Sequence, residues 1–197
     1  MKKIIYVMSL IASTMFVACG GSSTNNAAQT DNASASNESA APKSSAAGTV
    51  EVPVSVDAAA VKELDQKVDK SQFTLSYPSI FKPASEEAFG NDGVYLTDGT
   101  AGFQLMAANM YLPTKIKEEA DNMKGMMTRQ SFKFDEPTVT NNAYATKYID
   151  NGRAVWKFGI ANGNYLMNGE YAYPDDQAAK YEKYLGAMLQ SMKLKQE

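Results

Sequence analysis

The sequence predicts an α+β fold in which an antiparallel sheet of about six strands carries two main helices. Asn151-Gly152 and Asn162-Gly163 are strong hairpin signals within a strand-rich stretch from about Val139 to Tyr173. Helical patterns come before and after this stretch, so strands and helices follow one another in blocks. This order favours an antiparallel α+β sheet over a parallel sheet built from βαβ units.

The chain begins with the features of an export signal. Lys2 and Lys3 form a positively charged start, and a largely apolar run extends from Ile4 to Phe16. The run is too short to span a bilayer core, which needs about 20 residues. We therefore expect residues 1–18 to be a signal peptide. Phe16 is too bulky for the small-residue site that ordinary cleavage requires.

The only cysteine of the chain, Cys19, ends this run. Phe16-Val17-Ala18-Cys19 resembles the lipobox of bacterial lipoproteins, in which acyl chains such as palmitate are attached to the cysteine. The resemblance implies a lipid anchor on Cys19 in the bacterial cell envelope. Because Gly20 rather than Asp follows the cysteine, it also implies the outer membrane, facing the periplasm. The alternative is a free cysteine beside an ordinary cleavage site.

A tether is expected to follow the anchor. The stretch from Gly20 to Thr49 contains no aromatic or large aliphatic residue, so it cannot bury enough apolar surface to fold and should be disordered. Valines at positions 50, 52, 54 and 56 then alternate with other residues, either as an edge strand or as an extended lead-in. We assign residues 19–56 to the tether and residues 57–197 to one α+β domain, with its core at about 70–195.

The first part of the domain contains one short helix and three strands. Asp57 is a candidate cap for a helix whose apolar stripe is formed by Val61, Leu64 and Val68. Alternating apolar residues then predict strands at 73–77, 94–97 and 103–107, with Asp98-Gly99 in the turn between the second and the third.

Two longer helices are expected around the meander. Apolar residues at helical spacing predict the first from Thr114 to about Arg129, and Pro113 stands just before its start. The last helix follows Pro174 and is expected to be capped by Asp175. Its apolar stripe is formed by Ala178, Tyr181, Leu185, Met188 and Met192.

Two-residue turns at the two Asn-Gly pairs predict the register of the meander. Asp150 then faces Arg153 in the first hairpin. In the second hairpin Trp156 faces Gly169, and the indole ring covers the bare glycine backbone. The predicted core face carries Trp156, Phe158, Ile160, Met167 and Tyr171, with Ala143 and Ala145 beside them. The opposite, partly solvated face carries Tyr144, Tyr148, Arg153, Lys157 and Glu170.

A candidate binding patch lies on that opposite face. Tyr144 and Tyr148 are expected beside Arg153 and Lys157. Exposed aromatic side chains next to a cation are typical of protein interfaces. The simpler explanation of the tyrosines is that this residue favours strands.

The element order also resembles a known family. The extended start from Phe73 to Pro78, a hairpin, a helix, a long meander and a C-terminal helix are similar to the PsbP/DcrB-like superfamily over about residues 70–195. The resemblance implies an assembly or binding module, and it supplies no catalytic motif and no functional residue to transfer.

Composition excludes several functions. The chain contains no histidine and one cysteine, which excludes His-based catalysis, imidazole metal sites and Cys-based zinc sites. The net charge of −3, without a cluster of basic residues, argues against nucleic acid as a partner. No cofactor is expected. Ser79-Ile80-Phe81-Lys82 matches the S-x-x-K pattern of penicillin-binding enzymes, but the S-D-N and K-T-G partner motifs are absent.

The sequence therefore predicts a membrane-anchored envelope lipoprotein that is not an enzyme and that binds or helps to assemble another envelope protein. One alternative is a small-molecule or glycan binder that uses the tyrosine-rich sheet face. The other is a hydrolase that uses Ser79 or two carboxylates, for which four acidic doublets are available. The doublets are Glu86-Glu87, Glu118-Glu119, Asp135-Glu136 and Asp175-Asp176.

Overall fold

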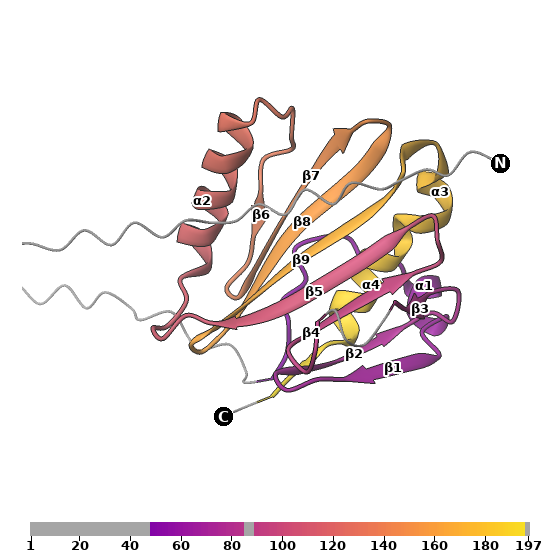
Figure 1. Cartoon of the computed structure of the whole chain (residues 1–197), viewed down its shortest axis with the longest axis horizontal. Helices are drawn as coiled ribbons and strands as arrows, with labels where there is room; N and C mark the ends of the chain where they lie inside the picture. The colour runs from indigo at the N-terminus through magenta and orange to yellow at the C-terminus, as the bar shows by residue number, and fades with distance from the viewer. Residues whose placement is uncertain (1–47, 85–88, 196–197) are drawn as a thin grey trace, which may run out of the picture. The chain divides into compact units, whose positions relative to one another are not determined.

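The computed structural model describes residues 48–84 and 89–195 of the chain. These residues form an α+β domain with two antiparallel sheets, which confirms the predicted fold class (Figure 1). Residues 1–47 lie outside the described part, so the signal peptide, Cys19 and most of the tether remain predictions.

The larger sheet of the described part has seven strands, in the order β3-β4-β5-β9-β8-β7-β6, and every neighbouring pair is antiparallel. The meander forms its centre and contributes the longest strands. In chain order the strands are β3 (Lys82–Pro83), β4 (Gly93–Thr97), β5 (Gly102–Asn109), β6 (Thr138–Val139), β7 (Ala143–Asp150), β8 (Arg153–Asn162) and β9 (Tyr165–Pro174).

A smaller sheet of three strands brings two strands from the first part of the domain together with one at its C-terminal end. Its order is β1-β2-β10, and β2 pairs with both neighbours in antiparallel fashion. The strands are β1 (Gln66–Asp69), β2 (Phe73–Tyr77) and β10 (Lys193–Leu194). The alternation of Phe73, Leu75 and Tyr77 places all three side chains in the core, as the sequence predicts.

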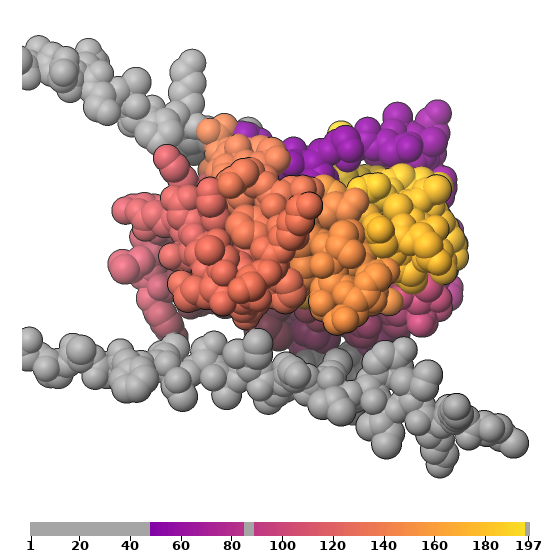
Figure 2. Space-filling model, turned by 90° about the horizontal axis from the view of Figure 1, so that it is seen from above, coloured from indigo at the N-terminus to yellow at the C-terminus, as the bar shows by residue number. Residues whose placement is uncertain are grey.

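The helices lie on both faces of the larger sheet. The described helices are α1 (Ala58–Lys62), α2 (Ile116–Arg129), the 3-10 helix η2 (Asp175–Gln177), α3 (Ala178–Tyr181) and α4 (Lys183–Ser191). Leu185, Met188 and Leu189 of α4 belong to the main buried cluster, together with side chains of β2 and of one sheet face. In Figure 2, the orange residues of the meander lie between the red residues of α2 and the yellow residues of the C-terminal segment.

The predicted register of the first meander hairpin is confirmed, and that of the second is wrong by two residues. Asp150 pairs with Arg153, but Trp156 pairs with Tyr171 instead of Gly169. The second turn is Gly163-Asn164 rather than Asn162-Gly163. Gly163 takes the positive φ of 58° at the first central position, which a type II′ turn requires. The ring that covers Gly169 is therefore Phe158, where the sequence predicts Trp156.

The shift by two residues leaves each side chain on its predicted face of the sheet, because side chains alternate between the faces with a period of two. Trp156, Phe158, Ile160, Met167 and Tyr171 share the core cluster, as predicted. The rings of Phe103 and Phe158 stack with their centroids 5.6 Å apart at the centre of this face.

Two helix predictions need correction. Asp57 caps α1 as expected, and its carboxylate accepts hydrogen bonds from the N–H groups of Ala59 and Ala60 at 2.7 and 3.0 Å. However, the helix ends at Lys62, and Val68 lies in β1 opposite Leu75. Pairing with β2 thus overrides the helical spacing of the apolar residues. Asp175 does not cap the last helix, because it lies inside η2, and the N-cap positions of η2 and α3 are Pro174 and Gln177.

The end of the predicted tether belongs to the domain. Val50, Val52 and Val54 pack against the core as an extended lead-in. The N–H of Glu51 donates to Oδ1 of Asn142 at 2.9 Å. These contacts correct the predicted boundary at residue 57, because the packed chain already begins near residue 48.

Candidate functional site

The candidate site lies on the face of the larger sheet that points away from the core. Register places the four residues of the predicted binding patch on this face, on β7 and β8. Neighbouring positions on β5 and β9 extend the face across the sheet. Some of these positions are buried and others are open to solvent, because helix α2 covers only part of the face.

Tyr144 is buried beneath α2, so the prediction that it is exposed is wrong. Only 1% of Tyr144 is accessible, and it clusters with Ile116, Ala120 and Leu166. Its ring also lies directly over Gly159, where a Cβ atom would overlap with it. Burial, with a smaller contribution from Glu119, raises the pKa of Tyr144 to about 12. Tyr144 therefore joins α2 to the sheet and is not available to a ligand.

Tyr148 is half-buried by the segment that follows α2. The ring of Phe132 packs on it with a centroid distance of 4.7 Å. Burial raises the pKa of Tyr148 to about 12, and the charges of Glu170 and Asp150 act in the same direction. Tyr148 stays a neutral phenol at physiological pH and contributes mainly packing.

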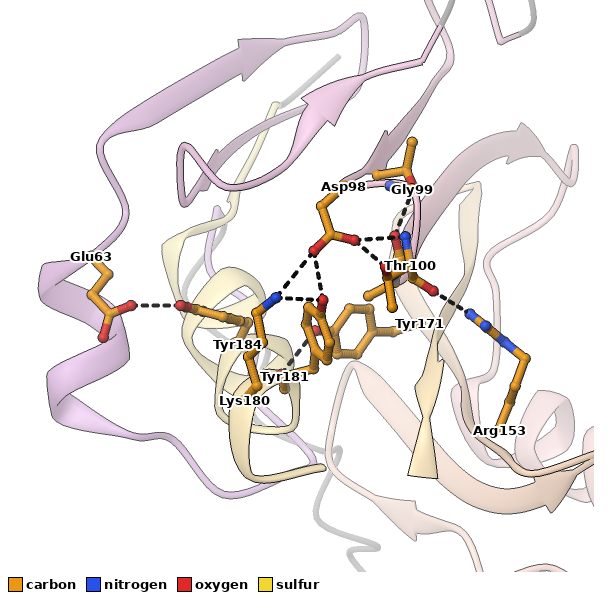
Figure 3. A network of polar contacts seen from close by, with 11 residues as sticks. Glu63, Asp98, Gly99, Thr100, Arg153, Tyr171, Lys180, Tyr181 and Tyr184 are labelled. Atoms are coloured by element: carbon orange, nitrogen blue, oxygen red, sulfur yellow. Dashed lines mark hydrogen bonds and ion pairs between the residues drawn. The ribbon is translucent and has the colours of Figure 1, made fainter. Parts of the chain in front are cut away.

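Arg153 holds two neighbouring segments together. Its guanidinium donates to the backbone oxygens of Thr100 and Ala172 at 2.9 and 3.2 Å. Figure 3 shows the side chain reaching from β8 to the turn that contains Thr100. The position is therefore explained by structure, and binding through Arg153 stays a prediction.

Lys157 lies near the centre of the face and is partly exposed. It makes an ion pair with Glu170 of the adjacent strand β9, and both side chains are about one-quarter exposed. Beside this pair lies a shallow hollow of about 140 Å³. Its lining residues come from β5, β8, β9 and α2: Gln104, Met123, Lys157, Phe158, Asn168, Gly169 and Glu170.

Strands β4, β5 and β9 continue this accessible region on the side away from the α2 contacts. Register aligns Tyr95, Gln104 and Glu170 in one row across the sheet and Met106 with Asn168 in the next. Met106 is 44% exposed, and Asn168 is exposed as well. We call Tyr95, Gln104, Met106, Lys157, Asn168 and Glu170 the open half-face.

Sequence reasoning found Lys157 and Glu170 of the open half-face and missed the residues on β4, β5 and Asn168. The alternation of β5 already separates Gln104 and Met106 from the buried Phe103 and Leu105. What was missing was the pairing of β5 with β9, which connects residues 66 positions apart, such as Gln104 and Glu170.

A second polar cluster links the turn after β4 to the C-terminal helices (Figure 3). Oδ2 of Asp98 accepts a hydrogen bond from the hydroxyl of Tyr181 at 2.6 Å, and Oδ1 accepts from the N–H groups of Thr100 and Ala101. Burial opposes the charged form of Asp98, but these hydrogen bonds outweigh it and lower the pKa of the carboxyl. The Tyr171 hydroxyl donates to the backbone oxygen of Tyr181 at 2.8 Å. Each group is engaged in holding the fold together.

The features that suggested a hydrolase do not converge among the described residues. Ser79 is exposed, and its N–H donates to Asp65 at 2.8 Å, while Lys82 lies in β3. Glu118 pairs with Lys115, and Asp175 and Asp176 lie in η2. The doublet at residues 86–87 lies outside the described part. No group of three or more acidic, histidine or cysteine residues in the described part could hold a metal ion.

Within residues 48–84 and 89–195, no helix is long and apolar enough to cross a bilayer. No protein-family model matches the chain. No curated protein matches it either.

Solved structures do resemble the chain. One is the solution structure of cyanobacterial PsbP (CyanoP) from Synechocystis sp. PCC 6803, with 12% identity and a TM-score of 0.46, covering 66% of this chain and 92% of that one. Another is a crystal structure from Bacteroides thetaiotaomicron VPI-5482, with 12% identity and a TM-score of 0.41. It covers 64% of this chain and 46% of that one. The structure of a PsbP protein is thus among those that the chain resembles.

Proposed function

We propose that the chain is a lipid-anchored protein of the bacterial cell envelope whose domain binds another envelope protein through the open half-face. The proposal assigns no catalytic role to the domain. The observation that supports the binding function is the open half-face itself, where a sheet surface that α2 could have covered is left accessible.

The chemistry of the open half-face suits a protein partner. It combines the aromatic ring of Tyr95 and the thioether of Met106 with the amides of Gln104 and Asn168. Aromatic residues and methionine are enriched in protein interfaces, and amides supply the hydrogen bonds of a polar rim. The Lys157–Glu170 pair adds one charge of each sign, which would fix the register of a partner more than its affinity.

The size of the hollow favours a protein surface over a small molecule. Pockets for small molecules usually enclose about 300–1,000 Å³. The hollow beside Lys157 has about 140 Å³ and opens onto the flat sheet. Together with the burial of Tyr144, this removes the main support for the glycan-binding alternative.

The anchor is supported by the sequence of the export segment. The apolar run ends at Cys19, and the rest of the chain contains no other cysteine. A lipid on Cys19 would hold the open half-face within reach of envelope proteins, because about 29 residues separate Cys19 from Gly48 and a chain of that length extends up to about 100 Å.

The proposal can be tested by cross-linking in cells. A photoreactive amino acid at Asn168 should trap one envelope protein. The matched control places it at Gln190, an exposed amide on α4 outside the open half-face. In the Cys19→Ser background the protein should move to the soluble fraction, and the cross-link from position 168 should be lost. Equal yields from positions 168 and 190, or no product from either, would contradict the binding function.

A further inference from the structure

An apolar loop at one end of the domain is highly exposed to solvent. Met110, Tyr111, Leu112 and Pro113 join β5 to α2. Tyr111 is 85% exposed and Leu112 is 72% exposed, the highest values among the exposed large hydrophobic residues of the described part. Single exposed apolar residues are ordinary, but adjacent ones at a projecting tip mark a contact surface.

This tip is held in place and is not a loosely attached loop. The N–H of Met110 donates to the backbone oxygen of Asn164 at 2.7 Å, and the N–H of Thr114 donates to that of Gly163 at 3.1 Å. Both ends of the loop are thus fixed on the turn between β8 and β9. Tyr111 has a φ of 60°, which is rare for a bulky residue, and its N–H donates to Oδ1 of Asn109. The fold thus maintains an uncommon, strained backbone conformation within the exposed tip.

The tip lies at the end of the domain where the chain from Cys19 enters. The side-chain amide of Asn162, next to the same turn, donates to the backbone oxygen of Lys195 at 2.8 Å. The N–H of Leu194 in turn donates to the backbone oxygen of Gly48 at 3.0 Å. Figure 1 shows the loop between β5 and α2 at the same lower end as β10.

Charged residues of both signs follow this apolar tip in the sequence, with two lysines and then Glu118 and Glu119. Lys115 and Lys117 follow it at the start of α2, and Lys193 lies on β10; all three are exposed. Glu118 is also close, as the partner of Lys115 at 2.9 Å. Tyrosine favours the membrane–water interface, and lysines beside an apolar insert can reach anionic headgroups.

We propose that the tip formed by residues 110–113 inserts into the interfacial layer of the membrane that holds the lipid on Cys19. The inference rests on the proposed lipid anchor. The anchor brings the domain to the membrane, and the tip then orients it, with β8 and β9 rising from the surface. A lipid surface accounts for the exposure of adjacent apolar residues at the end of the domain where the described chain begins, with Lys115 and Lys117 next to them in the sequence.

The test uses the full chain, in which an acylated Cys19 leaves no free thiol. Leu112→Cys, carrying an environment-sensitive fluorophore, is reconstituted through its lipid into vesicles of phosphatidylethanolamine and phosphatidylglycerol. The control is Ile149→Cys, which is 48% exposed at the opposite end of the meander. The ten residues of β8 separate the two ends by about 30 Å.

We expect the probe at position 112 to shift its emission to the blue and to lose intensity with spin-labelled lipids, while the probe at position 149 does neither. Adding Tyr111→Ser should weaken both effects. If neither probe responds on vesicle-bound protein, the inference is overturned, and a protein is favoured as the partner that contacts the tip. Recovery of the protein in the soluble fraction with a reactive Cys19 would overturn the anchor itself, a distinguishable failure.

Discussion

The contact between Phe158 and Gly169 offers a quantitative test of the sheet register. Phe158 is buried, stacks on Phe103, and covers the bare backbone of Gly169 across the strand pair. Phe158→Ala should cost about 3–5 kcal/mol of unfolding free energy, since it empties an aromatic site in the core. Gly169→Ala should cost about 1–3 kcal/mol, because the new methyl group overlaps with the ring.

The double variant should be more stable than the sum of the two effects predicts. Once Phe158 is replaced by alanine, the methyl group at position 169 no longer overlaps with an aromatic ring. In addition, alanine is favoured over glycine in a strand by about 0.5–1 kcal/mol. We therefore expect a favourable coupling of about 2 kcal/mol. The assay is urea unfolding of the full chain in the Cys19→Ser background, which carries no lipid.

A control double-mutant cycle combines Gly169 with Trp156 in place of Phe158. Trp156 is the residue that the register predicted from sequence places over Gly169. In the observed register Trp156 pairs with Tyr171, so Trp156→Ala and Gly169→Ala should be additive to within about 0.5 kcal/mol. Additive effects for Phe158 combined with strong coupling for Trp156 would refute the register and restore the turn at Asn162-Gly163.

Two further predictions concern pH. The pKa of Asp98 is lowered in the folded state, so its contribution to stability is present above the unfolded pKa of about 4 and is lost as the pH falls through the folded value. Asp98→Asn should therefore flatten the acid branch of the urea midpoint plotted against pH, and an unchanged branch would contradict the network around Tyr181. Burial raises the pKa of Tyr144 to about 12, so its contribution is complete below the unfolded value of about 10 and is lost between pH 10 and 12. Tyr144→Phe should reduce the loss of stability in this alkaline window, as followed by tyrosinate absorbance and circular dichroism; an identical alkaline transition would show that Tyr144 is not buried by α2.

The first hairpin could be predicted from sequence because its turn is determined locally. Asn151 and Gly152 both adopt positive φ, as a type I′ turn requires. In the second hairpin, Asn162-Gly163-Asn164 offers two possible two-residue turns. The side chain of Asn162 bonds to Lys195, 33 residues away, in the observed arrangement. No local sequence pattern indicates that contact. The observed register of the second hairpin therefore differs from the predicted one by two residues, while its side chains stay on their predicted faces of the sheet.

The candidate site was harder to predict, because it depends on where a helix packs. The residues of α2 are amphipathic in sequence, but nothing local shows which sheet face they cover. Contact with α2 buries Tyr144, while Lys157 and Glu170 on the same face remain accessible. Likewise, the apolar run from Met110 to Pro113 is visible in the sequence, but its exposure follows from the turn of β8 and β9 that holds it.

The central claim is that Cys19 carries the lipid that places this domain at the membrane. Mass spectrometry of the mature protein, purified from the membrane fraction, tests it most directly. We predict an N-terminal residue at Cys19 whose mass is increased by acyl chains. A mature chain with an unmodified Cys19 thiol, or one that begins at another residue, would contradict the account.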